Sequence, residues 1–567
     1  MNKKFAIALT IACLTLGSGS IYAATNLKAV PMERVIYLDG SKVECTGYTI
    51  EGNNYFKLRD LATVLNGTGS TFNVGFNNET GMIEIITGEV YTGKQELAPI
   101  TQVVETAYET NNPILVDGVK KQLKTYTINN STYFKLRDLA DIVGCEIEIN
   151  YSTGAIELTS QSTYMKKIDT VSQKQSNRLQ IHGSKNWTSD RWAENITDYL
   201  VEDNQGVKTI LSLGDNIEIV TYDTNWKVLE KKELPLELPL FGGFYSGEKF
   251  NYIVYGCENS EEDDKKEIMR IVKYDKQFNR IEDVKITGGE SFTVIPFDAG
   301  SLRMAEYGDT LVVHTSRERY LTEDGLNHQS QLTVILNTAS MKVTNDLGRF
   351  QKNHVSHSFD QFVKVDGNEH VLVDLGDAYP RTVVLQKGNG SSYKAVDLFD
   401  IPGKIGANCT GVSIGGLEVT KDHYVVGMNT IDHSKAREYT SYEIIGPDKN
   451  QRDVILCTVP KNSLLNNQVK QIQLTDYCGT DYTASAPYLV KVSDDKVLVL
   501  WEEYNMSNTQ DVKVKYVYVD SQGEMCSEIE TMKGARLSKC QPVITQEGVS
   551  WFVDQNSKRL VCTLPLA

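Results

Sequence analysis

The octapeptide Tyr55-Phe56-Lys57-Leu58-Arg59-Asp60-Leu61-Ala62 decides how the first part of this chain is built, because it returns without a change as residues 133–140. The same offset of 78 residues relates Leu38-Asp39-Gly40 to Val116-Asp117-Gly118. An internal repeat of this kind indicates two copies of one structural unit. We therefore expect two tandem modules, at about residues 30–90 and 108–160.

Each module shows the pattern of β-strands around one short helix. In the first copy, alternating apolar residues predict a hairpin that turns at Asp39-Gly40, and a second hairpin turns at residues 51–53. Leu58, Leu61, Ala62 and Leu65 then follow the i, i+3, i+4, i+7 spacing of a helix. Two further strands follow the helix, at residues 72–76 and 82–85. We expect each module to fold independently, so that Leu61→Asp would unfold only the first.

The repeated motif resembles a known family. Both copies carry the octapeptide after a Tyr-Thr-Ile strand and end in a Thr-Gly-x-Ile-Glu hairpin. Over about residues 30–160 this is similar to the copper amine oxidase N-terminal-like domain, also called the stalk domain, of exported proteins of Gram-positive bacteria. The resemblance implies a small antiparallel sheet packed on one helix and used as a non-catalytic mount. Amine oxidase activity is not expected, because the chain has no His-x-His pair and no Asn-Tyr-Asp or Asn-Tyr-Glu tripeptide.

The first 23 residues have the pattern of a secretory signal peptide. Lys3 and Lys4 precede an apolar run and small residues that lead to Ala23-Ala24. We expect cleavage after Ala23 and export, with the mature protein extracellular or associated with the cell envelope. A lipid-attachment role for Cys13 is the less favoured alternative. No later apolar run is long enough for a transmembrane segment.

Charge and cysteine usage exclude several classes of function. The net charge is −16, and removal of Lys3 and Lys4 would lower it to −18, which opposes binding of nucleic acid. The cysteines form no CxxC pair and none has a His at metal-ligand spacing, so we expect small buried side chains, no metal and no cofactor. The cations Lys57, Arg59, Lys135 and Arg137 are interpreted as a solvated face in preference to a site for anionic wall polymer.

The rest of the chain, residues 165–567, predicts a β-propeller. Residues 219–226 parallel residues 271–278, and each copy ends a strand in Tyr-Asp before a polar turn and a charged strand. Hairpins such as 301–313, 361–373 and 487–500 have the form of the first two strands of a propeller blade. We predict a mainly β fold with about seven blades. Six or eight blades, or a pair of β-sandwiches, are the alternatives.

Closure of the ring is also predicted from the sequence. The last unit, residues 542–566, offers three strands, so a fourth strand from about residues 178–182 would complete its sheet. A closed ring leaves few exposed strand edges.

Polar side chains are densest between Pro296 and Arg381, where five of the eight histidines lie in or beside the stretch. We expect a ligand-binding surface among them, without a catalytic residue. His354 and His357, three residues apart in an extended region, make a poor metal pair. The candidate ligand-binding residues are Arg303, Glu306, His314, Arg317, His328, His357, Asp377 and Arg381.

The sequence is compatible with two classes of function. The first is a non-catalytic envelope protein that uses the stalk modules as a mount and the propeller for recognition of cell-wall polymer, a glycan or a surface protein. The second is a secreted propeller enzyme that acts on carbohydrate, which would need two carboxylates about 5 to 10 Å apart in one cleft.

Overall fold

The computed structural model describes residues 26–39, 41–77, 82–93, 103–110, 113–150, 153–160, 164–171, 177–179, 193–407, 409–448, 450–507, 511–555 and 557–566. The predicted signal peptide lies outside these residues. The chain divides into two compact units, Met1–Gln161 and Ser162–Ala567. Each unit is described by itself.

The first unit contains both repeats, and each repeat supplies one helix and seven strands. The first repeat forms β1 (Asn26–Pro31), β2 (Ile36–Leu38), β3 (Ser41–Val43), β4 (Gly47–Ile50), β5 (Asn53–Lys57), α1 (Leu58–Val64), β6 (Phe72–Asn77) and β7 (Met82–Thr87). The second repeat forms β8 (Glu105–Thr110), β9 (Pro113–Val116), β10 (Val119–Gln122), β11 (Thr125–Ile128), β12 (Ser131–Lys135), α2 (Leu136–Val143), β13 (Glu146–Ile149) and β14 (Ile156–Thr159). The predicted hairpins and both helices are confirmed, and β1 and β8 are additional strands.

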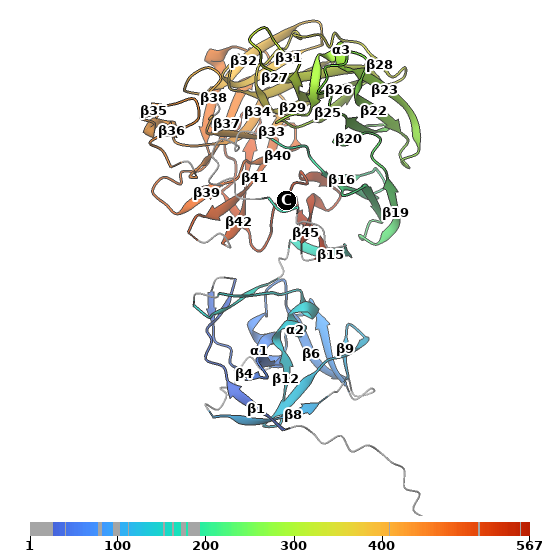
Figure 1. The fold of residues 1–567 in the computed structure, drawn as a ribbon. Coiled ribbons are helices and arrows are strands. Elements are labelled where there is room, and N and C mark those ends of the chain that lie inside the picture. Colours follow the sequence, from blue (N-terminus) through green and yellow to red (C-terminus); the bar gives the residue numbers. More distant parts are fainter. Residues whose placement is uncertain are drawn as a thin grey trace, which may run out of the picture. The chain divides into compact units, whose positions relative to one another are not determined.

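The prediction that the two modules fold independently is wrong, because every sheet of the first unit mixes strands from both repeats. Six strands close a barrel in the order β1-β4-β5-β12-β11-β8, and two further sheets have the orders β10-β9-β7-β6 and β13-β14-β2-β3. The joining strands β7 and β9 run parallel, as do β14 and β2. Neither repeat closes a sheet on its own strands, so the two copies form one intertwined domain (Figure 1).

The register between the copies has an internal twofold relation. Phe56 pairs with Phe134, its own equivalent, at the centre of the β5–β12 contact. Tyr48 packs edge-on against Tyr133, and Tyr55 packs edge-on against Tyr126, at ring centroid distances of 5.4 and 4.9 Å. Each contact is the copy of the other at an offset of 78 residues. The verbatim octapeptide therefore builds one symmetric interface inside the chain.

Turn residues tie the copies together in the same symmetric way. The carboxylate of Asp39 accepts hydrogen bonds from the backbone N–H and hydroxyl of Ser160, at 2.8 and 2.7 Å. The carboxylate of Asp117, its equivalent, accepts the same two bonds from Thr87, at 2.9 and 2.8 Å. Both aspartates have positive φ, 50° and 49°, a conformation that Asp tolerates better than most residues. The Asp-Gly turn that the sequence repeats thus ties each copy to a strand end of the other copy.

The second unit contains seven sheets of four or five strands within the described residues. The first three are β16 (Asp198–Glu202), β17 (Lys208–Leu213), β18 (Ile217–Tyr222) and β19 (Val228–Leu234); β20 (Leu240–Ser246), β21 (Asn251–Gly256), β22 (Glu267–Tyr274) and β23 (Arg280–Thr287); and β24 (Thr293–Pro296), β25 (Arg303–Tyr307), β26 (Thr310–Arg319), β27 (Gln329–Asn337) and β28 (Lys342–Val343). A short helix, α3 (Gly288–Ser291), precedes β24.

The remaining sheets follow in the same manner. They are β29 (Ser358–Asp366), β30 (Glu369–Gly376), β31 (Thr382–Gly388) and β32 (Tyr393–Asp400); β33 (Val412–Val419), β34 (His423–Thr430), β37 (Asp453–Pro460) and β38 (Lys470–Gln473); β39 (Tyr482–Ala484), β40 (Tyr488–Ser493), β41 (Lys496–Asn505), β42 (Val512–Asp520) and β43 (Glu530–Met532); and β44 (Val543–Thr545), β45 (Gly548–Gln555) and β46 (Lys558–Leu564) with β15 (Met165–Thr170). A two-stranded sheet of β35 (Glu438–Tyr439) and β36 (Ile444–Ile445) and two 3-10 turns, His433–Lys435 and Asn466–Gln468, lie in the connections.

The repeated Tyr-Asp motif forms one recurrent turn after the third strand of a sheet. Asp223 accepts hydrogen bonds from the backbone N–H groups of Asn225 and Lys227, both at 2.9 Å. Asp275 repeats this arrangement, and Asp520 does so as well. The third residue after each Asp has a positive φ, which is 67° at Trp226. The side chain of Asp replaces the missing backbone partners of the turn, which explains why this residue type recurs.

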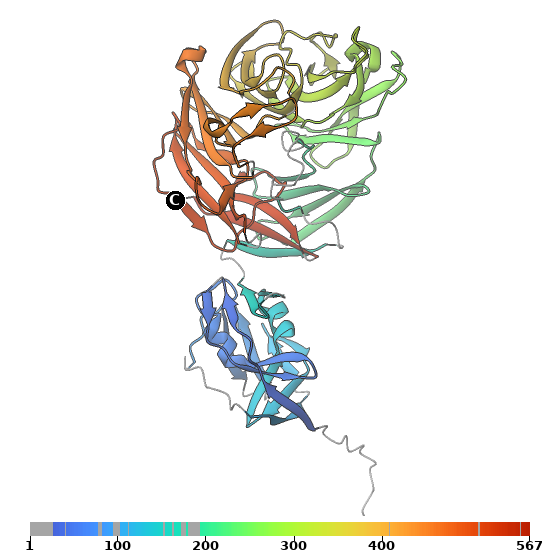
Figure 2. The ribbon, with the colours of Figure 1, turned by 60° about the vertical axis from the view of Figure 1, so that its left-hand side comes forward.

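The sheets of the second unit are arranged around a centre, as Figures 1 and 2 show. Their early strands contact one another in succession, from β20 through β25, β29, β33, β40 and β44 to β16. This arrangement gives a mainly β propeller fold. The seven larger sheets fit the predicted number of blades, and a closed ring of seven blades stays a prediction.

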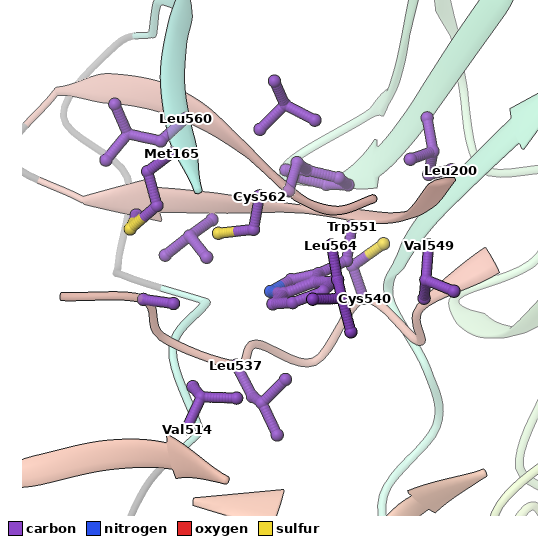
Figure 3. Packing of buried hydrophobic residues seen from close by; sticks show 14 of the residues in the cluster. Met165, Leu200, Val514, Leu537, Cys540, Val549, Trp551, Leu560, Cys562 and Leu564 are labelled. Carbon is purple, nitrogen blue, oxygen red and sulfur yellow. The ribbon is translucent and has the colours of Figure 1, made fainter. Parts of the chain in front are cut away.

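The last sheet joins the two ends of the unit, but the predicted donor of its fourth strand is wrong. β44, β45 and β46 supply three strands, as expected, and β15 supplies the fourth by pairing with β46. Of the predicted donor, residues 180–182 lie outside the described residues, and Arg178 forms an isolated bridge to Ser538. Met165 on β15 is 7% exposed and belongs to the same apolar cluster as Trp551 and Leu560 (Figure 3). A strand from the start of the unit thus covers the edge of its last sheet.

Candidate functional site

The histidines that reach solvent together lie just before two neighbouring strands. His328 precedes β27, and its backbone carbonyl accepts a hydrogen bond from the N–H of Arg319 on β26, at 2.9 Å. His357 precedes β29, and its N–H donates to the carbonyl of Gln329, at 2.9 Å. Its φ is 57°, in the left-handed region that His tolerates better than most residues. The backbone therefore places two side chains that are 29 residues apart at one point.

A carboxylate engages each of the two imidazoles. His328 Nε2 lies 2.7 Å from Asp324 Oδ2, and His357 Nδ1 lies 3.0 Å from Asp377 Oδ1. The two remaining ring nitrogens, His328 Nδ1 and His357 Nε2, face each other at 3.4 Å. The side chains of His328 and His357 are 27% and 24% exposed. We call these four residues the His pair site.

The two carboxylates of the His pair site differ in environment. Asp324 stands in a turn, where a hydrogen bond from the hydroxyl of Thr322 and then the contact with His328 lower its pKa to about 2. Its side chain is 54% exposed. Asp377 is fully buried, its N–H donates to the carbonyl of His357 at 3.3 Å, and its carbonyl accepts from Gly406 N–H at 2.8 Å. One ring is thus held by an exposed carboxylate and the other by a buried one.

Arg381 supports the site by hydrogen bonds to backbone carbonyls and does not face a ligand. Its guanidinium donates to the carbonyls of Asp377, Ala407 and Cys409, at 3.0, 2.8 and 2.7 Å. Burial lowers the pKa of Arg381, and the nearby Asp377 opposes that shift. These bonds fix the loop between β30 and β31 that carries Asp377.

Large exposed apolar side chains stand on or next to the chain segments that carry the residues of the His pair site. Each is more than half exposed: Leu321 (54%), Leu326 (58%), Phe350 (59%) and Tyr379 (69%). Phe350 also lies under the guanidinium of Arg319, 4.8 Å from its ring centroid. The carbonyl of Tyr379 accepts a hydrogen bond from Ser356, the neighbour of His357. Exposed apolar residues among polar groups are typical of interaction sites.

His314 has the hydrogen bonds of a catalytic base but no access to a substrate. Its Nδ1 lies 2.9 Å from Thr333 Oγ1 and its Nε2 lies 3.2 Å from Asp374 Oδ2. A hydroxyl, an imidazole and a carboxylate in this order are typical of nucleophilic catalysis. All three residues are fully buried, and Thr333 Oγ1 also accepts from Asn353 at 2.8 Å. The group is therefore a polar network that joins the third sheet to the fourth.

Arg317 is enclosed by backbone carbonyls. Its side chain is fully buried on β26 and donates to the carbonyls of Ser291, Leu347 and Gly348. Burial, with a smaller effect of Arg319, lowers the pKa of Arg317 to about 9. The residue holds the segments that flank its strand and does not face a ligand.

Arg303 and Glu306, both on β25, lie apart from the His pair site. Arg303 Nη1 lies 3.3 Å from Asp360 Oδ1, and its guanidinium lies 3.7 Å from the ring centroid of Phe362. Burial raises the pKa of Asp360, and the charge of Arg303 opposes that shift. Glu306 accepts from the N–H of Glu248 at 2.9 Å. The structure therefore assembles only His328, His357, Asp377 and Arg381 from the eight candidates, and adds Asp324.

Sequence reasoning named the stretch that contains Asp324 but did not assign the residue to the site. The available signal was the spacing Asp324-Gly325-Leu326-Asn327-His328, which places a carboxylate four residues before an imidazole across a glycine turn. Asp374, which anchors His314, carried no signal that separates it from other strand aspartates. Within the described residues, no group of three or more His, Cys, Asp or Glu side chains is arranged to hold a metal ion.

Two surface hollows lie away from the His pair site. One of about 240 Å³ in the first unit is lined by Lys135, Arg137 and residues 52–54, and one of about 330 Å³ in the second unit is lined by Asp397, Asp400 and Asn466. Asp397 already accepts a hydrogen bond from the side chain of Asn466, at 3.0 Å. In the part of the chain that the structure describes, no helix is both long and apolar enough to cross a membrane.

Comparison with known proteins gives likeness of structure only. No family model and no curated protein matches the chain. Among solved structures, the N-terminal domain of Nup159 has a TM-score of 0.35 at 9% identity, covering 72% of this chain and 97% of that one. A mutant of the Synechocystis protein titled ACO has a TM-score of 0.29 at 10% identity, covering 69% of this chain and 67% of that one. A prolyl endopeptidase structure has a TM-score of 0.33 at 10% identity, covering 76% of this chain and 48% of that one.

Proposed function

We propose that this chain is an exported, cell-envelope-associated protein of a Gram-positive bacterium that recognises a ligand through its β-propeller and has no catalytic role. The stalk-like repeats act as its mount, in keeping with the resemblance of the octapeptide motif. The observation that carries the recognition role is the set of exposed apolar side chains on or next to the segments that carry the His pair site. Such a surface offers apolar contact area together with a few fixed polar groups, which is what specific binding needs.

The ligand is a glycan, a neutral part of the cell-wall polymer or a surface protein. The net charge of −16 disfavours strongly anionic partners such as nucleic acid. Tyr379 and Phe350 supply exposed aromatic faces, while Asp324 and the imidazoles supply hydrogen-bonding groups. Aromatic residues of this kind contribute most of the binding free energy in many interfaces.

Carbohydrate hydrolysis is the second candidate, because Asp324 and Asp377 flank the same site. A glycosidase needs an acid and a base that both reach the substrate. Asp377 is fully buried and engaged by His357, and Asp324 is engaged by His328. This geometry favours recognition over hydrolysis.

The test is binding of the purified protein to a glycan array and to envelope proteins from a Gram-positive bacterium. A variant with Leu326→Ala and Phe350→Ala removes apolar area beside the His pair site. A matched control with Leu229→Ala and Tyr442→Ala removes residues of similar exposure, 58% and 63%, elsewhere on the unit. We expect the first variant to bind about tenfold more weakly or worse and the control to bind normally. Equal binding by both variants, or hydrolysis of a glycan that is abolished by Asp324→Asn, would contradict the proposal.

A further inference from the structure

The two facing nitrogens of the His pair site create a local electrostatic conflict. His328 Nε2 and His357 Nδ1, the outer nitrogens of the pair, each contact a carboxylate. A carboxylate only accepts hydrogen bonds, so each of these two nitrogens carries the N–H of its ring. A neutral imidazole carries one N–H. The inner nitrogens, His328 Nδ1 and His357 Nε2, are then both lone-pair acceptors, although they lie only 3.4 Å apart. An electrophile between them would remove this repulsion.

The separation suits a metal cation. A first-row cation such as Zn²⁺ binds imidazole nitrogen at about 2.0 to 2.1 Å with tetrahedral angles, which places two such nitrogens roughly 3.4 Å apart. The ring centroids are 5.6 Å apart, so the rings extend away from the gap between the nitrogens. The pair therefore has the spacing of two adjacent ligands on one cation.

The outer contacts provide the second feature of a metal site. Histidines that bind metals usually donate their other N–H to a carboxylate or carbonyl, which fixes the tautomer and increases the basicity of the ligating nitrogen. Both histidines here have such a carboxylate, at 2.7 and 3.0 Å. His423 has only half of this arrangement, because its Nδ1 contacts Asp422 at 3.0 Å without a second imidazole.

The His pair site is reached by solvent and held in place by backbone hydrogen bonds. About a quarter of each imidazole is exposed, so a cation can enter from solvent and keep water on its remaining positions. The backbone hydrogen bonds of Arg319 to His328 and of His357 to Gln329 hold the two residues at the starts of β27 and β29, which belong to two different sheets. The site needs no folding step to bring its ligands together, which lowers the cost of binding.

The geometry points to a divalent transition-metal site in which His328 Nδ1 and His357 Nε2 bind one cation, with Asp324 and Asp377 as the residues that orient them. Two protein ligands and water make a modest, exchangeable site rather than a structural one. The segments that carry these residues also carry the exposed Leu321, Leu326 and Tyr379, so the cation can contribute a coordination position to whatever binds there. This inference does not depend on the proposed recognition role, because metal binding is measured without a ligand.

The experiment titrates tag-free protein with Zn²⁺ by calorimetry and records the electron paramagnetic resonance spectrum with Cu²⁺. We expect one cation per chain and coupling to two nitrogens. His328→Gln and His357→Asn should each weaken the affinity at least tenfold. Asn is chosen at position 357 because it tolerates the positive φ of that residue. Asp324→Asn should weaken it about tenfold while keeping both nitrogens, because it removes only the outer carboxylate.

The control is His423→Gln, which removes an imidazole held by one carboxylate and should leave the affinity unchanged. Thermal melts of each variant verify that the fold is intact. Equal Zn²⁺ affinity in the wild type and in His328→Gln would overturn the inference. So would an unchanged two-nitrogen spectrum in the double variant His328→Gln with His357→Asn, which would assign the cation to other residues.

Discussion

Replacing Leu61 by Ala tests whether the two repeats share one core. Leu61 on α1 is 1% exposed and belongs to a cluster that also contains Phe134, Leu139 and Ile156 of the second repeat. A Leu→Ala change at such a site costs about 2 to 5 kcal/mol, because apolar contacts are lost and a cavity remains. Since β5 pairs with β12 and β14 pairs with β2, this loss should destabilise both copies together.

Hydrogen exchange of the full chain followed by mass spectrometry gives the required local readout. A loss of about 2 kcal/mol raises the population of the open state roughly 30-fold, so slowly exchanging amides of β5, β12 and β14 should all exchange faster. Peptides of the second unit should be unchanged. Leu139→Ala, at the equivalent position, should give the same pattern, whereas Val119→Ala, at a residue 62% exposed, should change little.

Exchange that accelerates only within residues 26–93 after Leu61→Ala would refute the reasoning. It would mean that the second repeat keeps a core of its own, contrary to the pairing of the strands. A change confined to the second repeat after Leu139→Ala would have the same meaning.

Three further predictions concern the second unit. Thermal unfolding of residues 172–567, which lack β15, should occur well below that of residues 162–567, because β46 loses its partner strand and the apolar cluster that contains Trp551 loses Met165. Similar melting of the two proteins would exclude closure by this strand. Lys208→Ala should destabilise the unit by about 3 to 5 kcal/mol in urea unfolding, because the buried ammonium of Lys208 pairs with Glu202 and Glu547 at 3.2 and 3.4 Å. The control Lys231→Ala, at an exposed ion pair, should cost less than about 1 kcal/mol. Burial, with a smaller effect of His314, lowers the pKa of His370 to about 4. The contribution of neutral His370 to stability is therefore present above about pH 6.5 and is lost as the pH falls towards 4. The free energy of urea unfolding should differ less between pH 7 and pH 5 in His370→Gln than in the wild type.

Much of the local structure could be predicted from the sequence, because it depends on residues close in the chain. The helix stripe, the hairpin turns and the Tyr-Asp turns of the propeller all depend on periods or side-chain bonds within a few residues. Pairing between repeats is different. The apolar pattern of β2 is satisfied equally by a partner strand of its own copy or of the other copy. The pattern therefore could not reveal that β2 pairs with a strand of the second repeat.

The closing strand and the site show the same limit in other ways. β15, with the sequence Met-Lys-Lys-Ile-Asp-Thr, buries mainly Met165 and therefore lacks the alternation by which strands are recognised. Among the histidines, composition could not separate His314 from His328, since both lie in the same polar stretch. Burial separates them, because His314 is enclosed between two sheets while His328 stands at the start of a strand beside solvent.

The verbatim octapeptide has a physical reason that the intertwined fold supplies. At the centre of the β5–β12 contact Phe56 meets Phe134, and Tyr55 and Lys57 meet Lys135 and Tyr133, so each copy is the packing partner of the other. A substitution in one copy therefore changes the surroundings of residues in the other copy, and at Phe56 it changes those of the equivalent residue. Farther from this axis the constraint relaxes, and Leu65 corresponds to Val143 at the ends of the two helices. The identity of the two octapeptides is thus explained by the symmetric contact that they form with each other. The proposed mount is one domain rather than two.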